Sequence, residues 1–392
     1  MERGHDIVLF GATGYTGALT AEYLATNAPR ELRWALAGRN REKLEAVRAE
    51  LADIDPDRPL PDLLLADTDD PASIRNLAAS ARVVATTVGP YSEYGEAVVA
   101  ACAAVGTDYV DLCGEPAFVD RMYVQHHATA QRTGARIVHA CGFDSVPHDL
   151  GVLFTVGQLP EGVPLHVEGF VRAKANASGG TLHSALGAFA DPGGMLAAAR
   201  ERRALEGVPE GRRIRIDRSG RPRTRLARGW TAPLPTLDPQ VVVRSAAALG
   251  RYGPDFRYGH YAAFLRLASA VGAVGGAAGL MAAAQVPPLR ERLRSLRAPG
   301  EGPGEEELAE GWFTVHFSGS GGGRRVYTLV SGGEPGYAAT AGMLAESALC
   351  LMQDDLPPTS GQVTTAVAMG EALIRRLPRA GVEFRVLDTV ED

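Results

Sequence analysis

The sequence feature that most constrains the fold is a glycine-rich turn near the N-terminus. Gly11-Ala12-Thr13-Gly14-Tyr15-Thr16-Gly17 directly follows the apolar run Ile7-Val8-Leu9-Phe10. An unbroken apolar run of this kind is typical of a buried parallel strand. The glycines permit a tight turn, close approach of the backbone to a phosphate, and close packing of the next helix. The amide groups at the start of that helix, Ala18 to about Asn27, then face a bound anion.

The spacing of this turn is G-x-x-G-x-x-G rather than the commoner G-x-G-x-x-G, so it predicts a variant dinucleotide cradle. A purely structural turn is the alternative, but the position of the motif as the first βα turn favours the cradle. The sequence therefore predicts an α/β fold that opens with a Rossmann-type parallel sheet. The residues expected to contact the cofactor here are Gly11, Thr13, Gly14, Tyr15, Thr16 and Gly17.

The end of the second predicted strand, within residues 32–38, indicates which dinucleotide is bound. In NAD-specific proteins an acidic residue at this point binds the ribose 2′-hydroxyl. This chain has Arg39 there and no carboxylate before Glu42. A guanidinium matches a 2′-phosphate, and Asn40 and Lys43 follow within one helical turn. The pattern predicts NADP(H), bound by these three residues; the alternative is that the charges only open the next helix.

Further strands are expected at residues 63–67, 82–88, 108–112 and 136–141. In an open α/β sheet the ligand lies outside the carboxyl ends of the strands. Asp67 is therefore expected beside the adenine, with a helix-capping role as an equal alternative. The residues expected along the nicotinamide are Thr87, Val88, Gly89 and Pro90.

The most polar turn of the first half is residues 142–149, Gly-Phe-Asp-Ser-Val-Pro-His-Asp, after the sixth strand. One interpretation is that it only caps the next helix, with Ser145 at the N-cap and Pro147 in the first turn. The other is that it faces the nicotinamide, with Gly142 and Phe143 against the cofactor; the two are compatible. The candidate proton donors on this turn and the facing one are Tyr91, Asp144, Ser145 and His148.

Past Gly151 the regular alternation of strand and helix stops. Strands are expected at 163–174, 241–247 and 312–317, with a hairpin through Gly319–Gly323. These patterns predict an inserted α+β domain with a mostly antiparallel sheet. The expected domains are 1–150 for NADP binding, 151–350 for substrate and oligomerisation, and 351–392 as a C-terminal helix and strand that return to the first domain.

Other segments of the second half carry weaker patterns. A helix is expected to begin at 179–181 and to break at 192–194, while the ten arginines of 201–228 are typical of solvated hairpins or mobile loops. The Pro-, Gly- and Glu-rich stretch 298–307 is expected to be a surface loop. Residues 267–284 are uncharged, rich in Ala and Gly, and followed by four arginines. A packed or dimer-forming helix is the first interpretation of them, contact with a membrane surface the second, and a membrane crossing the third, since Ala and Gly contribute little transfer free energy.

Composition excludes several other classes of protein. A net charge of −6 argues against a general nucleic-acid binder. The four cysteines show no framework spacing and indicate reduced thiols in the cytoplasm. No charged-then-apolar leader precedes the first strand, so no signal peptide is expected. The histidines, cysteines and carboxylates show no convincing metal spacing, so no metal site is expected.

Several motifs together resemble a known family. They are GATGYTG, LAGRN, TVGPY at 87–91, YVDLCGE at 109–115 and CGFDSVPHDLG at 141–151, with GQVTTAVAMGEALIRRL before GVEF near the C-terminus. These motifs are similar to those of the saccharopine dehydrogenase-like oxidoreductases, nearest the trans-acting enoyl reductases. The resemblance is strongest over the first 150 residues and the last 70, and residues 200–310 are not diagnostic.

The resemblance implies an NADP-type Rossmann domain with an inserted α+β domain. It implies a reductase of an enoyl C=C bond in a hydrophobic, polyketide- or lipid-type substrate on a synthase or acyl carrier. The G-x-D-P-G loop of saccharopine reductases is replaced here by Gly142-Phe143-Asp144-Ser145-Val146-Pro147, which argues against amino-acid substrates. The alternatives are a saccharopine-type C=N oxidoreductase and a non-catalytic NADP(H) sensor. A homodimer in the cytoplasm is expected, with membrane association as an open question.

Overall fold

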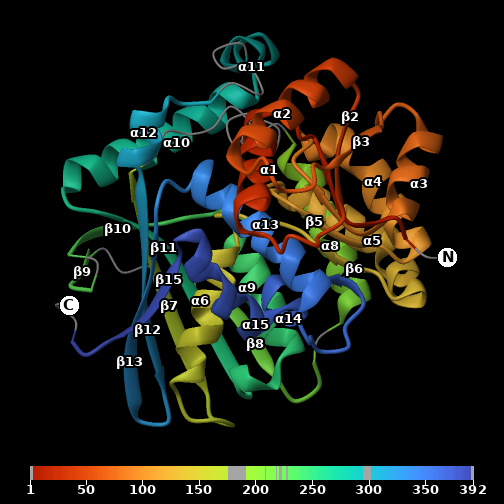
Figure 1. Ribbon diagram of the computed structural model, residues 1–392. Helices are drawn as coiled ribbons and strands as arrows, with labels where there is room; N and C mark the ends of the chain where they lie inside the picture. Colours follow the sequence, from red (N-terminus) through yellow and green to blue (C-terminus); the bar gives the residue numbers. More distant parts are fainter. Residues whose placement is uncertain are drawn as a thin grey trace.

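Two β-sheets joined by shared helices make up the computed structural model (Figure 1). The structure describes residues 3–174, 191–207, 209–217, 219, 223–226, 228–294 and 302–389. The first sheet, sheet A, has seven strands in the order β14-β6-β5-β4-β1-β2-β3. Every adjacent pair in it runs parallel. This is the Rossmann arrangement that the glycine turn predicts.

The elements of this half alternate regularly along the chain. The strands of sheet A from the first half are β1 (His5–Phe10), β2 (Trp34–Gly38), β3 (Asp62–Leu65), β4 (Ala81–Thr86), β5 (Asp108–Asp111) and β6 (Arg136–Val138). The helices between and after them are α1 (Tyr15–Asn27), α2 (Arg41–Ile54), α3 (Pro71–Ser80), α4 (Tyr91–Val105), α5 (Pro116–Thr133) and α6 (Val146–Gly157).

Strand β1 shows why this sheet has two buried faces. Successive side chains of a strand point to opposite faces. Ile7 and Leu9 pack into one apolar cluster, which includes side chains of α1, α2 and a later helix, α13 (Ala338–Gln353). Val8 and Phe10 pack into a second cluster with α3, α4 and α5. The unbroken apolar run of β1 is therefore explained by helices on both faces.

The second sheet, sheet B, has eight strands in the order β15-β13-β12-β7-β11-β10-β9, with β8 beside β11. Its pairings are antiparallel, except that β11 runs parallel to β7 and β8. The expected mostly antiparallel sheet is thus confirmed. Its strands are β7 (Leu165–Lys174), β8 (Arg213–Asp217), β9 (Arg223–Thr224), β10 (Gly229–Pro233), β11 (Asp255–Phe264), β12 (Trp312–Gly321), β13 (Arg324–Gly332) and β15 (Glu383–Leu387).

Helix α6 links the two sheets. It begins after β6 of sheet A and packs on β7, β12 and β13 of sheet B, so closely that a Cβ on Gly151 would lie 2.4 Å from the Phe317 ring. Its residues Val152 and Val156 belong to the same apolar cluster as Ile7 and Leu9 of β1. The start of α6 therefore lies where the carboxyl ends of sheet A meet the inner face of sheet B.

The C-terminal part of the chain contributes to both sheets. Strand β14 (Gly361–Val363) lies beside β6, and β15 lies beside β13. Short helices connect them: α14 (Thr365–Ala368), α15 (Gly370–Arg376) and the 3₁₀ turn η2 (Leu377–Ala380). Glu346 of α13 accepts hydrogen bonds from Tyr23 of α1 at 2.9 Å and from Arg376 at 2.8 Å. Buried groups thus hold the C-terminal segment on the Rossmann half.

One strand assignment from the sequence is wrong. Residues 241–247 were expected to form a strand but lie in helix α9 (Asp238–Ala248). The run Val241-Val242-Val243 suggests a strand because β-branched residues favour sheets. Tertiary packing overrides that preference, since Val242 and Ala246 pack with α6 and sheet B in one cluster. Pro239 just inside the helix start is a signal for the observed helix.

The remaining helices lie partly in segments expected to be irregular. Pro192 begins a helix rather than breaking one, because Asp191 accepts a hydrogen bond from the Gly194 amide at 2.8 Å and caps it. The expected helix start at 179–181 lies outside the described residues. The remaining elements are α8 (Pro192–Glu206), η1 (Gly250–Tyr252), α10 (Leu267–Ala284), α11 (Pro287–Arg294) and α12 (Glu305–Glu310). The arginine-rich stretch thus contains a helix end and two strands, and the expected surface loop contains the start of α12.

Candidate active site

The glycine turn has the geometry of a dinucleotide cradle. Gly11 has φ of +92°, and a Cβ there would lie 2.8 Å from Thr87 Oγ1 and from a Val88 methyl group. A Cβ on Gly17 would lie 2.1 Å from the Gly11 carbonyl oxygen, so α1 can approach β1 only through glycine. A Cβ on Gly14 would meet nothing closer than 3.5 Å. The first and third glycines are therefore required by the protein itself, whereas the second faces open space.

Helix α1 offers its N-terminus to that space. Gly14 is the N-cap, and among the described residues no side chain caps the helix and no acidic residue lies in its first turn. An uncapped N-terminus is an anion site, because its amide groups and the helix dipole favour negative charge. The cradle therefore fits the pyrophosphate of a dinucleotide.

The end of β2 fits a 2′-phosphate. Arg39 and Lys43 are both exposed, and neither is in an ion pair within the described ranges. Asn40 is the N-cap of α2, and its side-chain oxygen accepts a hydrogen bond from the Lys43 amide at 3.0 Å. Asn40 therefore fixes the start of the helix that carries Lys43, while Arg39 remains available for a phosphate.

Arg39→Ala should reduce the preference for NADPH over NADH, which we expect to be at least about tenfold in the wild type. The guanidinium can form a charge-assisted fork with a 2′-phosphate and has no comparable partner on NADH. Affinities for both cofactors are measured by isothermal titration calorimetry. Arg41→Ala is the matched control, because Arg41 is also exposed and, among the described residues, pairs with Glu45 of its own helix at 3.7 Å. Equal wild-type affinities for the two cofactors would contradict the assignment.

The loop after β4 lies directly against the glycine turn. The Thr87 hydroxyl donates to the Gly11 carbonyl at 3.1 Å, and the Val88 amide donates to Thr86 Oγ1 at 3.2 Å. Gly89 and Pro90 follow, joined by a cis peptide bond, and Pro90 precedes α4. The structure thus brings this loop beside the cradle.

Asp67 lies in a turn after β3, where its side chain accepts a hydrogen bond from the Asp69 amide at 3.1 Å. The residue that caps α3 is Asp70 and not Asp67.

Tyr91 is held by the backbone on both sides of its hydroxyl. The hydroxyl donates to the Thr86 carbonyl at 3.1 Å and accepts from the Leu112 amide at 3.1 Å. Burial, with Asp111 nearby, raises its pKa well above the usual range. Both partners are backbone groups that link β4 to the end of β5. We therefore assign Tyr91 a structural role and do not retain it as a proton donor.

The loop after β6 is held between β5 and α13. A Cβ on Gly142 would lie 2.8 Å from Leu112 and 2.9 Å from Thr340 of α13. The Phe143 amide donates to Thr340 Oγ1 at 3.0 Å, and the Phe143 ring lies edge-on to His148, with centroids 5.4 Å apart. Gly142 and Phe143 thus position the start of α6, whatever contact they make with the cofactor.

Ser145 occupies the N-cap position of α6 but does not act as a side-chain cap. Its side chain is fully buried, and its hydroxyl has no hydrogen-bond partner among the described residues. A buried hydroxyl without a partner is costly unless a ligand satisfies it. Ser145 and Pro147 therefore occupy the positions that the capping interpretation predicts, but the Ser145 hydroxyl does not cap the helix.

His148 forms a buried pair with Asp238, a residue that the sequence did not single out. His148 Nδ1 lies 2.8 Å from Asp238 Oδ1, and both side chains are at most 3% exposed. Asp238 also accepts a hydrogen bond from Thr236. Burial alone would raise the pKa of Asp238, but the charge of and hydrogen bond from His148 hold it below its usual value. Asp238 is therefore a carboxylate that orients the His148 ring through Nδ1.

The other nitrogen of His148, Nε2, is the atom of this site that is best suited to proton transfer. Both nitrogens of His148 are buried and lack a hydrogen bond of good geometry in the part of the chain that the structure describes, but Nδ1 forms the 2.8 Å ion pair with Asp238. A buried imidazole with a carboxylate beside Nδ1 and no partner at Nε2 is suited to proton transfer with a bound molecule. The predicted candidate His148 is thus placed in a chemically competent arrangement.

A second histidine extends this cluster into sheet B. His260 Nε2 lies 3.5 Å from Asp238 Oδ2, and Tyr258 shares a 2.8 Å hydrogen bond with His260 Nδ1. Burial lowers the pKa of His260 to about 3, and burial raises that of Tyr258 well above its usual range. Tyr258 therefore donates to a neutral His260. The ligand atoms of His148, Asp238 and His260 lie within 4.8 Å of one another, a spacing that could hold a metal ion.

Asp144, on the loop after β6, faces the loop after β5. It is only partly exposed, and burial raises its pKa to about 6, with Asp238 adding to the shift and His148 opposing it. A Cβ on Gly114, just after β5, would lie 2.6 Å from Asp144 Oδ2. Three of the four predicted candidates, Asp144, Ser145 and His148, thus share one junction between the sheets, and Tyr91 does not.

Sequence reasoning missed Asp238, Thr236, Tyr258 and His260. The usable signal was Thr236-Leu237-Asp238-Pro239, which is typical of a helix start and would have placed a polar cap beside α6. Tyr258 and His260 lie two residues apart in β11 and so share one face of it, a placement that only the tertiary fold reveals.

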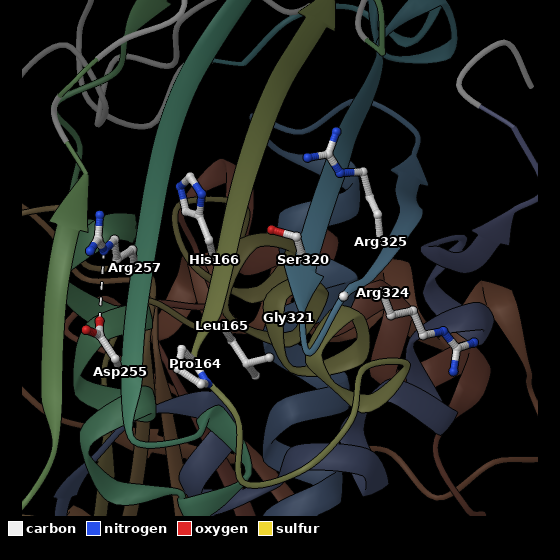
Figure 2. A pocket seen from close by; sticks show the side chains of 10 residues that line it. Pro164, Leu165, His166, Asp255, Arg257, Ser320, Gly321, Arg324 and Arg325 are labelled. Carbon is white, nitrogen blue, oxygen red and sulfur yellow. Dashed lines mark ion pairs between the residues drawn. The ribbon is translucent and has the colours of Figure 1, made fainter.

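A separate cavity of about 480 Å³ lies at the other end of sheet B (Figure 2). It is lined by residues such as His166, Arg324 and Arg325 and contains none of the predicted site residues.

Comparison with known proteins agrees with the fold and the cradle. Residues 7–138 match the family model of the saccharopine dehydrogenase NADP-binding domain. A protein of Mycobacterium tuberculosis strain H37Rv, provisionally named a trans-acting enoyl reductase, is 38% identical over 98% of this chain and 97% of its own length. The trans-acting enoyl reductase of Mycobacterium leprae is 36% identical, over 97% of each chain.

Among solved structures, apo saccharopine dehydrogenase (L-Glu forming) from Saccharomyces cerevisiae matches with a TM-score of 0.53 and 11% identity, covering 98% of this chain and all of that one. At that identity the match shows the fold alone. The family model identifies NADP(H) as the cofactor, as the sequence predicts. The chain belongs to the saccharopine dehydrogenase-like oxidoreductases, in the branch of the trans-acting enoyl reductases.

Proposed function

We propose that this protein reduces the C=C bond of an α,β-unsaturated acyl thioester with NADPH, on a hydrophobic chain carried by a separate acyl carrier or synthase. The observation that carries the proposal is the identity of 36–38% with proteins named trans-acting enoyl reductases, along almost the whole chain. The buried His148–Asp238 pair, at the start of α6, supplies a matching proton donor.

The residues divide the chemistry between binding and proton transfer. When bound, NADPH supplies a hydride to the β-carbon of the double bond. Gly14 and the N-terminus of α1 hold the pyrophosphate, and Arg39 holds the 2′-phosphate. The Ser145 hydroxyl donates a hydrogen bond to the thioester oxygen, where negative charge develops.

His148 completes the reduction. Its Nε2–H gives a proton to the α-carbon, and the Asp238 carboxylate balances the charge of the protonated ring and keeps Nδ1–H directed at itself. His148 regains its proton from solvent before the next turnover. His260 remains neutral because of its pKa of about 3, so it supports Asp238 rather than donating a proton.

The test uses NADPH deuterated at C4 and enoyl pantetheine thioesters of increasing chain length. We expect NADPH oxidation with these thioesters and the label at the β-carbon of the product by mass spectrometry. Glutamate with an aldehyde that forms an imine is the comparison substrate. NADPH oxidation with the imine alone would replace the proposal by C=N chemistry. NADPH binding without oxidation on either substrate would indicate a sensor.

A further inference from the structure

The longest apolar segment of the chain lies outside the folded core. Helix α10 spans 18 residues, and only Ala270 and Ala284 of them are buried. It contains no Asp, Glu, Lys or Arg, and by length and composition it is long and apolar enough to cross a membrane. Figure 1 shows α10 and α11 at the edge of the molecule, beyond the two sheets. An exposed apolar helix of this size marks a contact surface.

The pattern of exposure indicates what covers α10. All nine residues from Val271 to Gly279 are exposed, which is two and a half turns on every side of the helix. A second protein surface, including a second copy of this chain, would cover only one stripe of such a helix and leave the remainder in water. Lipid acyl chains surround an apolar helix from several sides, so they account for the full circumference.

The charge next to α10 indicates which class of lipid this surface binds. Helix α11 carries Arg290 and Arg292 against Glu291, and its Leu289 and Leu293 are four residues apart and so share a face. A basic amphipathic helix beside an apolar one is typical of proteins that lie in the interface of an anionic bilayer. The whole chain has a net charge of −6, so attraction to anionic lipid has to be local. The same positive charges would repel one another in a two-fold dimer formed through this face.

The topology of sheet B excludes a single membrane crossing by α10. Strand β11 precedes α10 and β12 follows it, and both pair with β7, one on each side. A crossing would put these two strands on opposite sides of the bilayer. The chain would then have to return through the hydrocarbon with the charged helices α11 and α12, which is costly. The helix therefore lies on the membrane rather than across it.

We propose that α10 and α11 form a docking surface for an anionic lipid bilayer, with α10 inserted at the level of the acyl chains and Arg290 and Arg292 of α11 at the headgroups. This inference does not depend on the proposed reaction. It explains why an apolar helix is exposed on all sides of an otherwise well-buried fold.

The test is flotation of the full-length protein with vesicles of phosphatidylcholine, with and without phosphatidylglycerol. We expect the wild type to float with the anionic vesicles. Val271→Asp combined with Val274→Asp should lower binding about tenfold or more, since it puts two charges in the acyl region. Leu196→Asp with Leu205→Asp, on exposed leucines of α8, is the matched control and should leave binding unchanged.

The charge contribution is tested separately. Arg290→Glu with Arg292→Glu should remove the preference for anionic vesicles, since each basic residue near the surface contributes about fivefold. Arg324→Glu with Arg325→Glu, at the exposed hairpin tip in Figure 2, is the control and should retain it. NADPH binding is measured in every variant to confirm the fold. Failure of the wild type to float, or a Val271/Val274 variant that only converts a dimer to a monomer in light scattering, would overturn the proposal.

Discussion

His148→Gln should lower the single-turnover rate of enoyl reduction by about 10²–10⁴ while leaving NADPH affinity within about threefold. The expectation rests on the geometry of one ring. Its Nδ1 is held 2.8 Å from Asp238, and its buried Nε2 has no hydrogen-bond partner among the described residues. Glutamine preserves much of the volume and polarity of histidine but cannot act as an acid near neutral pH. Stopped-flow absorbance of NADPH with a saturating enoyl thioester measures the rate.

Two further variants separate chemistry from structure. His260→Gln should leave the rate within about fivefold, because its pKa of about 3 keeps His260 neutral, and it meets Asp238, Tyr258 and the edge of the His148 ring without donating a proton to a ligand. His166→Gln, at the remote cavity of Figure 2, controls for replacing any histidine on sheet B. Equal losses in His148→Gln and His260→Gln would show that the cluster acts through stability rather than through proton donation by His148.

Asp238 is expected to act through His148. Asp238→Asn removes the negative charge that balances the protonated ring and replaces one carboxylate oxygen with an amide donor, so Nδ1–H is no longer strongly favoured facing residue 238, while Nε2 remains present. We expect a smaller loss of rate than in His148→Gln, about 10–10². Wild-type NADPH affinity should persist, since Asp238 lies in α9 and not in the cradle.

The Rossmann half could be predicted because its determinants are local. The apolar run of β1, the glycine turn and Arg39 lie within the first 39 residues, and each feature predicts the local structure around it. Asn40 as the N-cap of α2 and Asp70-Pro71 at the start of α3 are likewise recognisable from a few adjacent residues. Parallel topology follows once strands alternate with helices.

The polar centre could be predicted only in part, because its partners are distant in sequence. Asp238 lies 90 residues after His148, just before a segment whose valines suggest a strand. Tyr91 shows the same limit from the other side. Its position near the nicotinamide loop is recognisable in the sequence, but the two backbone groups that bind its hydroxyl come from β4 and from the end of β5. Long-range packing, and not residue type, decides which polar groups remain available to a ligand.

Gly14→Val should abolish measurable NADPH binding, an affinity loss of about 100-fold or more, in a protein that remains folded. The physical reason is the difference between the glycines of the turn. Gly14 has φ of −83° and ψ of 160°, a conformation that valine adopts readily, and a Cβ there meets no protein atom closer than 3.5 Å. The added side chain therefore occupies only the space above the N-terminus of α1, where the pyrophosphate is expected.

Gly17→Val is the matched contrast, because it fails for another reason. A Cβ at Gly17 would lie 2.1 Å from the Gly11 carbonyl oxygen, so the backbone of α1 has to move away from β1. We expect a loss of at least about 3 kcal/mol in the free energy of unfolding, measured with urea, before any question of cofactor binding arises. Gly14→Val should unfold at nearly the wild-type urea concentration. If Gly14→Val kept NADPH affinity within about threefold of wild type, the phosphates would lie elsewhere, and the open space above the second glycine would need another occupant.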